Sequence, residues 1–502
     1  MEQFVIALDQ GTTSSRALLV DARGNVRAMT QSAFPQHFPK PGWVEHDPSD
    51  IVSSQLKVLA ELLVSSGVSA SQIAGIGITN QRETTVVWDR ASGEPVCNAI
   101  VWQCRRTTDL VSRVCADPRV REDVTRRSGL IPDAYYSASK IAWILDEVPG
   151  ARDAARRGEL AFGTVDSWLI WNLTQGAVHA TDPTNASRTM LYNIHDGAWD
   201  PVLCDLFGIP LEMLPEVRPS SGSFGVMSHP VIAGEIPLCG VAGDQQAALF
   251  AQCCFEPGQA KATFGTGCFL LMHTGKTACE SSHGLVTTVA ASAPGSCGLE
   301  YALEGSVFMA GALIQWLKEG LGIIGDPAES EELALSVPDS SGVCVVPAFT
   351  GLGAPYWDAD ARGAIYGLTR GATRAHLARA CLEAQAFQVH DVLSGMRKDA
   401  GIPISSFSVD GGACRNDFLL QRCSDIVGLP IERPACVEST ALGAAYLAGL
   451  SAGVWKDLEE IRSLREVEGA FDPVLDCDER RRLLEYWHEC VARTRSDALA
   501  RS

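Results

Sequence analysis

The sequence predicts an α/β protein built from two large lobes, and three observations lead to this prediction. The chain has 502 residues, more than a single hydrophobic core usually supports. Runs rich in β-branched residues and segments of helical periodicity follow one another in a mixed order, not in strict alternation. Segments 7–13 and 262–270, in opposite halves of the chain, share the pattern of strand, small-residue turn and strand. We therefore expect one copy of this hairpin in each lobe, with lobes spanning 1–254 and 255–502.

The elements can be placed in order along the chain. Strands are expected near 3–9, 15–20, 26–33, 73–79, 84–89, 236–242, 260–272, 299–304, 343–347, 405–410 and 429–433. Helices are expected near 48–65, 107–115, 137–147, 164–173, 245–252, 306–319, 375–398, 416–427 and 439–452. The first helix has a strong start signal, because Asp47 can cap its N-terminus and Pro48 suits its first turn.

Composition excludes several classes of partner. Hydrophobic residues make up 46% and charged residues 20% of the chain, as in ordinary globular proteins. The net charge of −19 argues against binding of nucleic acid or of an anionic membrane, since both require basic surface. A polyanionic substrate must then be held locally, by backbone N–H groups, helix N-termini, a few arginines and Mg²⁺. No apolar run is long enough to suggest stable membrane insertion.

The 17 cysteines form no C-x-x-C pair, and two of them, Cys253 and Cys254, are adjacent. This distribution favours reduced thiols that serve as small core residues over a disulfide framework or a zinc site. The N-terminus lacks a basic segment and reaches Asp9 after five apolar residues, so it does not resemble a signal peptide. A cytoplasmic protein is therefore expected.

The first hydrophobic segment is the most informative part of the chain. An apolar run from residue 4 ends in Asp9, a turn of glycine and hydroxyl residues follows, and a second apolar run leaves after Arg16. Such a hairpin offers N–H groups, hydroxyls and an arginine to an anion, with a carboxylate at its base for a cation. Mg²⁺ needs only one or two carboxylates besides water and phosphate oxygens. The pattern indicates a nucleotide phosphate site, although an ordinary hairpin with a polar turn would also fit.

Two later segments could complete such a site. G-V-A-G-D-Q-Q at 240–246 places Asp244 between a strand end and a helix start, where the helix dipole is positive. D-G-G-A at 410–413 repeats this arrangement with glycines that permit close approach of a flat ring. The sequence contains neither G-x-x-x-x-G-K-[ST] nor a protein-kinase Gly-rich loop. Each segment alone would fit a simple turn, but their joint occurrence in this order is specific.

Together, D-Q-G-T-T-S-S-R at 9–16, G-T-G at 265–267 and D-G-G-A at 410–413 resemble the nucleotide-binding segments of the actin-like ATPase superfamily. Segments 135–147 and 363–383 resemble the two signatures of one of its branches, the FGGY carbohydrate kinases. The resemblance extends from Ile6 to about Leu450. It implies two RNase-H-like lobes with ATP and Mg²⁺ in the cleft between them. Four further segments, 41–47, 77–84, 102–106 and 181–190, resemble family members that phosphorylate glycerol.

The resemblance also implies roles for individual residues. Substrate contacts are expected from Arg82, Glu83, Trp102, Tyr135, Asp244, Gln245 and Phe269. Nucleotide contacts are expected from Thr12, Thr13, Ser14, Arg16, Thr266, Gly311, Gln315, Gly412 and Asn416. Asp9 and Asp244 are expected to position Mg²⁺, and Asp244 is also the expected general base.

The chemistry of these residue types agrees with the implied roles. Arg82 and Glu83 supply a donor fork and an acceptor for hydroxyls, but a strand would point them apart, so they require a turn; a surface ion pair is the alternative. Trp102 and Phe269 could shield a carbon chain, although aromatic residues more often belong to the core. Gly311 and Gln315 are four residues apart and would share one helix face.

The implied activity is transfer of phosphate from ATP to the 3-hydroxyl of glycerol, with glycerol and ATP or ADP as small-molecule partners and a dimeric or tetrameric assembly. One alternative is another FGGY kinase that acts on a pentulose, a tetritol or gluconate. A second is a non-kinase actin-like ATPase, which would have no use for a polyol site at Arg82, Glu83 and Tyr135.

Overall fold

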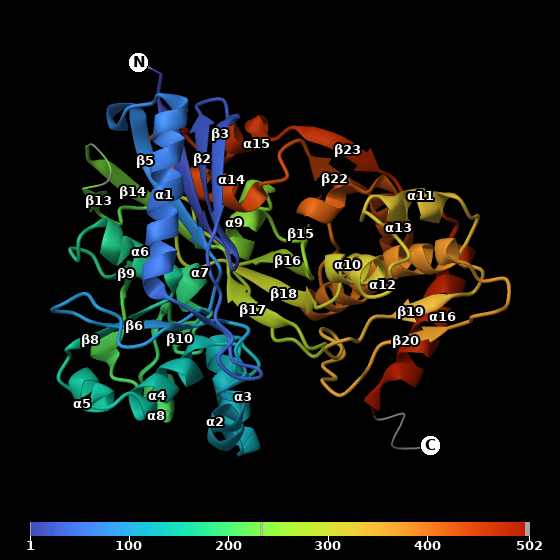
Figure 1. Ribbon diagram of the computed structural model, residues 1–502, viewed down its shortest axis with the longest axis horizontal. Helices are drawn as coiled ribbons and strands as arrows, with labels where there is room; N and C mark the ends of the chain where they lie inside the picture. The colour runs from blue at the N-terminus through green and yellow to red at the C-terminus, as the bar shows by residue number, and fades with distance from the viewer. Residues whose placement is uncertain (1, 231, 233, 497–502) are drawn as a thin grey trace.

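The computed structural model describes residues 2–230, 232 and 234–496, and it contains two large mixed sheets, one in each half of the chain (Figure 1). The first sheet has the order β13-β14-β5-β1-β2-β3. Its strands are β1 (Phe4–Gln10), β2 (Ser14–Asp21), β3 (Val26–Ala33), β5 (Ile73–Asn80), β13 (Val226–Met227) and β14 (Ile236–Gly243). The second sheet has the order β17-β18-β16-β15-β21-β22-β23. Its strands are β15 (Gln259–Phe264), β16 (Cys268–Gly275), β17 (Val286–Val289), β18 (Tyr301–Val307), β21 (Ser406–Asp410), β22 (Ile431–Pro434) and β23 (Val467–Phe471).

The two sheets share one topology. In the first, β1 forms an antiparallel hairpin with β2, β2 pairs antiparallel with β3, and β1 runs parallel to β5, which is parallel to β14. In the second, β15, β16, β18, β21 and β22 repeat the same four pairings, with the same neighbours and directions. The hairpin repeat predicted from the sequence is thus confirmed, and the two-lobed α/β fold with it.

Helices cover both faces of the first sheet. Ile6 and Leu8 of β1 pack with α1 (Pro48–Ser66) and α6 (Val165–Leu173). The alternate residues Val5 and Ala7 face the opposite side, where they join a cluster with α9 (Asp244–Ala251) and α14 (Ser439–Ser451). This two-residue alternation of a strand buried on both faces produces a layered helix–sheet–helix arrangement.

Helix α14 comes from the far end of the chain, yet it lies against the N-terminal strands (Figure 1). The approach is close because glycines line it. A Cβ on Gly77 of β5 would lie 2.0 Å from the Ala444 carbonyl oxygen, and one on Gly443 of α14 would lie 1.9 Å from the Ala247 carbonyl oxygen of α9. α14 belongs to the segment 255–502, which was expected to form the second lobe. This segment therefore also completes the core of the first sheet.

Helix α9 lies between the two sheets. Ala247 and Phe250 pack into the cluster with α14 and the first sheet, while Leu249 packs with Leu271 of β16 and Ala302 of β18. The helix that begins at Asp244 therefore contributes to the packing of both halves.

The second sheet packs mainly against α10 (Gly311–Glu319), α12 (Arg374–Ala400), α13 (Asp417–Val427) and α16 (Cys477–Thr494). The helix predicted from residue 306 begins at Gly311, because β18 continues to Val307. The predicted strand 260–272 is two strands around the turn at 265–267.

The remaining elements are short. The helices are α2 (Thr108–Val114), α3 (Pro118–Ser128), α4 (Ser137–Glu147), α5 (Ala151–Arg156), α7 (Pro183–Ala186), α8 (Pro201–Phe207), α11 (Glu329–Leu335) and α15 (Leu458–Leu464). The strands are β4 (Glu45–His46), β6 (Val86–Asp89), β7 (Ala99–Ile100), β8 (Leu160–Gly163), β9 (Ala180–Thr181), β10 (Tyr192–Asn193), β11 (Ala198–Trp199), β12 (Glu216–Val217), β19 (Cys344–Val346) and β20 (Ala364–Tyr366).

All 17 cysteines belong to the described part of the chain, and each is a free thiol; most are buried. Within that same part, no helix has both the length and the apolar character that crossing a bilayer requires. The cysteines thus fill core space, as predicted.

The close approach of α14 leads to a stability prediction. Gly443→Ala should destabilise the protein by roughly 1–3 kcal/mol, because the added methyl group must push α14 away from α9. Helix propensity alone would favour alanine by about 0.5–1 kcal/mol, so the two effects have opposite signs. Urea unfolding measures the result. Gly371→Ala is the matched control, because the nearest atom there is 3.7 Å away; a Gly443→Ala protein as stable as this control would refute the packing argument.

Candidate active site

Three parallel strands of the first sheet end at the same edge, and each has predicted site residues at or just after its end. Asp9 is the penultimate residue of β1, Arg82 and Glu83 follow β5, and Asp244 follows β14. β5 lies between β1 and β14 in the sheet. Carboxyl ends of parallel strands are a recurrent place for ligand binding in α/β proteins. The fold thus brings together residues that lie up to 235 positions apart (Asp9 to Asp244).

The segment after β5 turns as the sequence requires. Glu83 has φ +61°, in the left-handed region, so Arg82 and Glu83 do not point to opposite sides as they would in a strand. Both side chains are buried, at 3% and 1% exposure. The predicted turn is confirmed, and the alternative of a surface ion pair is wrong.

Arg82 forms a buried ion pair with Glu304 of β18. Its Nη1 and Nη2 donate to the two carboxylate oxygens of Glu304 at 2.6 and 3.0 Å. Arg188 adds a second cation, donating from Nη2 to Glu304 at 3.1 Å and from Nε to Glu83 at 2.6 Å. Burial would raise the pKa of Glu304, but Arg188 and Arg82 lower it to about 2. Glu304 is therefore ionised and connects the two halves of the chain.

Asp244 is the first residue of α9 and is held by two donors. The Arg82 Nε lies 3.0 Å from its Oδ1, and the Gln245 backbone N–H donates to the same oxygen at 2.8 Å. The side chain is 31% exposed. Since both contacts fall on Oδ1, the carboxylate is oriented while Oδ2 stays available to a ligand.

Asp9 is buried in a negatively charged environment. Burial raises the pKa of its carboxyl to about 7; Arg16 opposes this shift, and the charges of Asp244 and Glu438 add to it. Arg16 lies 3.5 Å from Asp9 and 3.2 Å from Glu438. One arginine thus serves two carboxylates, and a further cation would relieve the excess negative charge.

Aromatic residues form a wall near these charges. The Trp102 Nε1 donates to Thr12 Oγ1 at 3.0 Å, and its ring meets that of Tyr135 at a centroid distance of 5.4 Å. Lys140 of α4 donates to the backbone carbonyls of Tyr135 and Tyr136 and so holds this segment. The wall connects the predicted phosphate hairpin to the predicted substrate residues.

The other predicted residues near this edge lie as follows. Gln245 is buried, and its Oε1 accepts from Lys261 Nζ at 2.5 Å. Phe269 is half-buried in β16, opposite Thr263 and Ser306. Thr13 is exposed at the hairpin tip, and the Ser14 hydroxyl accepts from Gln31 at 2.9 Å.

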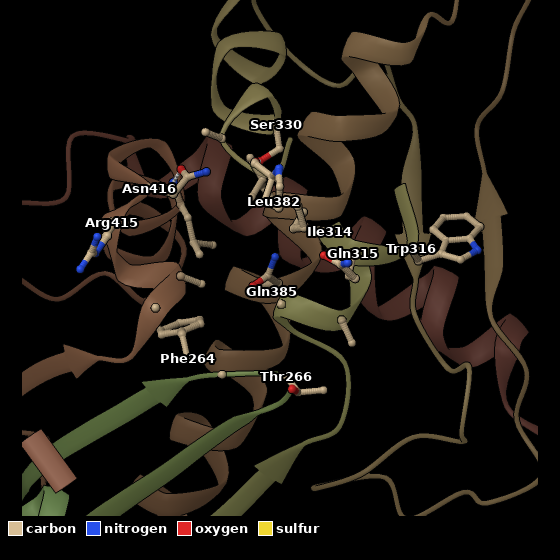
Figure 2. Close-up of a pocket in the computed structure, with 18 of the residues that line it drawn as sticks. Phe264, Thr266, Ile314, Gln315, Trp316, Ser330, Leu382, Gln385, Arg415 and Asn416 are labelled. Atoms are coloured by element: carbon tan, nitrogen blue, oxygen red, sulfur yellow. Dashed lines mark hydrogen bonds between the residues drawn. The ribbon is translucent and has the colours of Figure 1, made fainter. Parts of the chain in front are cut away.

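A cavity of about 960 Å³ opens in the second half of the chain (Figure 2). It is lined by five of the residues predicted to contact nucleotide, namely Thr266, Gly311, Gln315, Gly412 and Asn416. The backbone is tightly packed beside it: Gly411 has φ +90°, and a Cβ there would lie 2.5 Å from the Phe264 carbonyl oxygen. Arg415 points away from the other labelled residues (Figure 2).

Gln385 of α12 also lines this cavity, and no sequence motif indicated a role for it. Its side chain lies among the lining residues (Figure 2) and is 1% exposed. Neither Nε2 nor Oε1 has a hydrogen-bond partner among the described residues. A buried amide without partners is unfavourable, so a ligand that supplied both a donor and an acceptor would be stabilised here.

The cavity and the carboxylate edge are distinct parts of the surface. None of the hairpin residues 12–16 lines the cavity in the described structure. The hairpin of the second half is formed by β15 and β16. Its turn, with Thr266 at the tip, forms part of the cavity wall. A ligand that used both parts would have to be elongated, with a flat group in the cavity and an anionic group toward the hairpins.

Comparison with known proteins identifies the family. Residues 4–251 match the N-terminal domain of the FGGY family of carbohydrate kinases, and residues 260–452 match its C-terminal domain. The chain belongs to the FGGY family of carbohydrate kinases. The resemblance predicted from the sequence motifs is confirmed.

Similar proteins cover the FGGY chain almost completely. A glycerol kinase of Shewanella frigidimarina is 55% identical over 98% of both chains. Glycerol kinase 2 of Thermotoga maritima is 54% identical, covering 98% of this chain and 99% of its own. The crystal structure of Plasmodium falciparum glycerol kinase with ADP superposes with a TM-score of 0.93, at 36% identity and 98% coverage of each chain.

No sequence motif indicated a role for Glu304 or Arg188 of this FGGY chain. Glu304 was detectable in principle, because it is the one charged residue in the strand Tyr301–Val307. A charge in a strand buried on both faces requires a partner. The partner could not be deduced, since Arg82 lies 222 residues away.

Glu304→Gln should destabilise this FGGY chain by roughly 3–5 kcal/mol at pH 7, because Arg82 and Arg188 lose their shared counter-ion while they stay buried. The pKa of Glu304 is below its ordinary value, so its contribution is full above pH 4.5 and declines as the pH falls toward 2. Urea unfolding should therefore show a smaller difference in stability between the parent and the variant at pH 4 than at pH 7.

Glu300→Gln is the control for this measurement. Glu300 stands just before β18, has a side chain that is 41% exposed and pairs with His273. Its removal should change stability by about 0–1 kcal/mol. Equal stability of the two variants at pH 7 would show that the Glu304 ion pair contributes nothing specific.

Proposed function

We propose that the chain transfers the γ-phosphoryl group of ATP to glycerol and forms sn-glycerol 3-phosphate and ADP. The observation that carries this proposal is the full-length similarity, above 50% identity, to proteins named glycerol kinase. The carboxylate edge agrees with it, since it offers the polar groups and the oriented Asp244 that transfer to a small polyol requires.

Asp244 is the proposed general base. Its Oδ1 is held by Arg82 and by the start of α9, so Oδ2 can accept the proton of the attacking hydroxyl. The hydroxyl oxygen forms a bond to the γ-phosphorus while the bond from that phosphorus to the bridging oxygen of ADP breaks. General-base assistance of this kind contributes roughly 10²–10⁴-fold in rate. The rest of the acceleration is expected from alignment and charge stabilisation.

The proposed glycerol site lies between the ion network and the aromatic wall. Glu83, Tyr135 and Gln245 are the proposed hydroxyl partners, and Trp102 and Phe269 are proposed to shield the carbon chain. Most donors of Arg82 already serve Glu304, Asp244 and Gln246. We therefore propose that Arg82 orients Asp244 and donates to glycerol only through its remaining N–H.

The nucleotide is proposed to place its base in the cavity and its phosphates between the two hairpins. Thr12, Thr13, Ser14 and Arg16 would face the phosphates from one side, and Thr266 from the other. Gly311, Gln315, Gly412 and Asn416 would surround the nucleoside. Cavity lining by all of the last four supports this division.

Asp9 and Asp244 fit a Mg²⁺ ion. Burial raises the pKa of Asp9 and the charge of Asp244 raises it further, so a bound cation would favour the ionised carboxylates. Magnesium prefers one or two carboxylates together with phosphate oxygens and water. When bound, the ion would neutralise phosphate charge.

We also propose a lobe boundary at residue 254 and a dimeric or tetrameric assembly. The free thiols support a cytoplasmic location.

A coupled assay of ADP release tests the function. We expect turnover with glycerol, little with xylulose, erythritol or gluconate, and only slow ATP hydrolysis without an acceptor. Activity confined to one of the other sugars would move the chain to another FGGY activity. Rapid ATP hydrolysis independent of any acceptor would support the non-kinase ATPase.

Asp244→Asn should lower kcat at least about 100-fold while ATP still binds, because the amide keeps the shape but cannot accept the proton. Asp196→Asn, at an exposed position of a turn, is the control and should leave kcat unchanged. Retention of activity within tenfold of the parent would remove Asp244 from the role of base.

Gln385→Leu should raise the KM for ATP about 2–10-fold, the effect of losing one hydrogen bond, and leave the KM for glycerol unchanged. The amide can donate to and accept from the edge of adenine, as amide side chains do elsewhere. The parent should therefore prefer ATP over purine riboside triphosphate, which lacks the amino group, and the variant should not. Gln388→Leu, one turn along α12 and outside the cavity, is the control. An unchanged preference would exclude base recognition by Gln385.

A further inference from the structure

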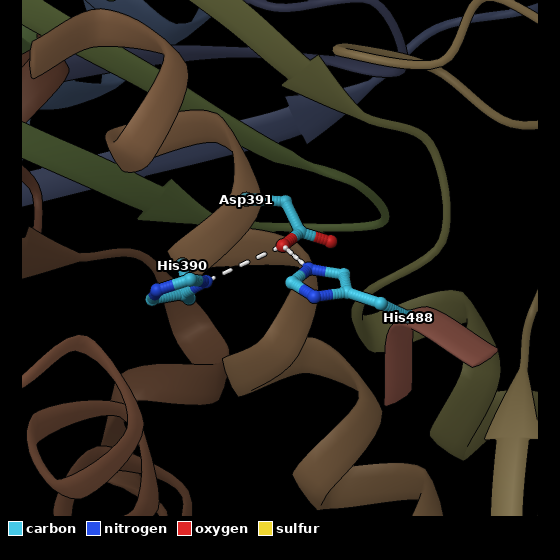
Figure 3. A group of neighbouring side chains, drawn as sticks. All are labelled: His390, Asp391 and His488. Atoms are coloured by element: carbon cyan, nitrogen blue, oxygen red, sulfur yellow. Dashed lines mark hydrogen bonds and ion pairs between the residues drawn. The ribbon is translucent and has the colours of Figure 1, made fainter. Parts of the chain in front are cut away.

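Two imidazoles and a carboxylate converge in the second half of the chain (Figure 3). His390 and Asp391 belong to α12, and His488 belongs to α16. The His488 Nε2 lies 2.8 Å and the His390 Nδ1 lies 3.3 Å from the same oxygen, Oδ1 of Asp391. One ligand atom from each residue lies within 4.8 Å of the other two.

The second oxygen of Asp391 is fixed by other groups. The Tyr356 hydroxyl and the Trp487 Nε1 each donate to Oδ2 at 2.7 Å. Neutral donors thus hold the carboxylate in one orientation and leave Oδ1 to the two histidines. Metal-binding carboxylates are commonly held in this way by hydrogen bonds behind the ligand atom.

The three residues differ in exposure in a way that suits an open site. Asp391 is buried, His390 is partly covered, and His488 is about half exposed. An incoming ion would meet the imidazoles from the solvent side, and water could occupy its remaining position. None of the three residues lines the cavity or contacts the carboxylate edge.

We propose that His390, Asp391 and His488 bind a divalent transition-metal ion of the Zn²⁺ type. Two imidazole nitrogens and one carboxylate oxygen are a ligand set that this ion uses, with water in the fourth position. Ligands about 2.0–2.1 Å from a tetrahedral ion lie about 3.3 Å apart. The His390–Asp391 distance already has this value, and the His488–Asp391 distance must widen by about 0.5 Å, which a half-exposed side chain can provide.

A bound ion would connect two helices that are distant in the sequence. α16 packs on the second-lobe core through Trp487, Cys490 and Val491. The ion would add a cross-link to α12 from outside this core. It would therefore stabilise the second lobe, and its effect on unfolding does not depend on the proposed kinase activity.

Titration with Co²⁺ tests the proposal, using metal-free full-length protein without nucleotide. We expect one Co²⁺ per chain, the intense visible bands of a four-coordinate ion and a higher thermal midpoint. Bands from thiolate-to-cobalt charge transfer would instead show binding by cysteines and would overturn the assignment. Zn²⁺ should displace the cobalt and remove the visible bands.

His390→Gln and His488→Gln should each weaken Co²⁺ binding at least tenfold and abolish the metal-induced stabilisation. His283→Gln is the control, because His283 pairs with Asp399 without a second imidazole; it should bind like the parent. If the parent does not bind Co²⁺, or if the His488→Gln protein binds it as tightly as the parent, the cluster consists only of two histidine–aspartate contacts.

Discussion

The paired contact between the Arg82 guanidinium and the Glu304 carboxylate links the two halves of the chain at the carboxylate edge. It joins a turn of the first half to a strand of the second across 222 residues, and both side chains are buried. Water cannot substitute for either partner at this depth, so the bidentate geometry defines their relative position. Because the third nitrogen of the same guanidinium reaches Asp244, the position of that carboxylate depends on the ion pair.

Helix α9 extends this dependence to the hydrophobic core. One of its sides packs with α14 and the first sheet, and the opposite side meets β16 and β18 of the second. A change in the angle between the sheets would alter the surroundings of this helix and of Asp244 at its start. The charged network and the apolar packing therefore hold the same residue by independent means, one electrostatic and one steric.

Local chemistry explains what the sequence could predict. The turn residues at 11–14 and 265–267 identify two hairpins, and their equivalence predicts the repeated sheet without any knowledge of pairing. Asp9, Asp244 and the turn at Arg82 follow strand ends, so parallel pairing alone brings them to one edge. Motifs in these same turns, together with the signatures at 135–147 and 363–383, predicted the family, and the matches over 4–251 and 260–452 confirm it. The roles of individual residues stay predictions.

What the sequence could not supply depends on contacts between distant segments. Nothing local distinguishes Arg188 or gives Gln385 a cavity to face. The helices α3 and α16 were not predicted, because charged residues are frequent in both. The packing of α14 could not be predicted either. The sequence predicts an apolar helix near 439–452, but either sheet could have been its partner. The glycines at 77, 240 and 443 are a weak indication of this packing, because each lies where two backbones approach closely.

The position of α14 has a consequence for biosynthesis. Val5, Ala7, Leu18 and Val20 leave the ribosome more than 400 residues before helix α14, which packs over them and is not complete until residue 451 has been made. Until α14 has been made, one apolar face of the first sheet therefore lacks part of its native cover and is open to association with chaperones or other chains. The nascent N-terminal half must remain partly unfolded, or be protected, until α14 packs against it.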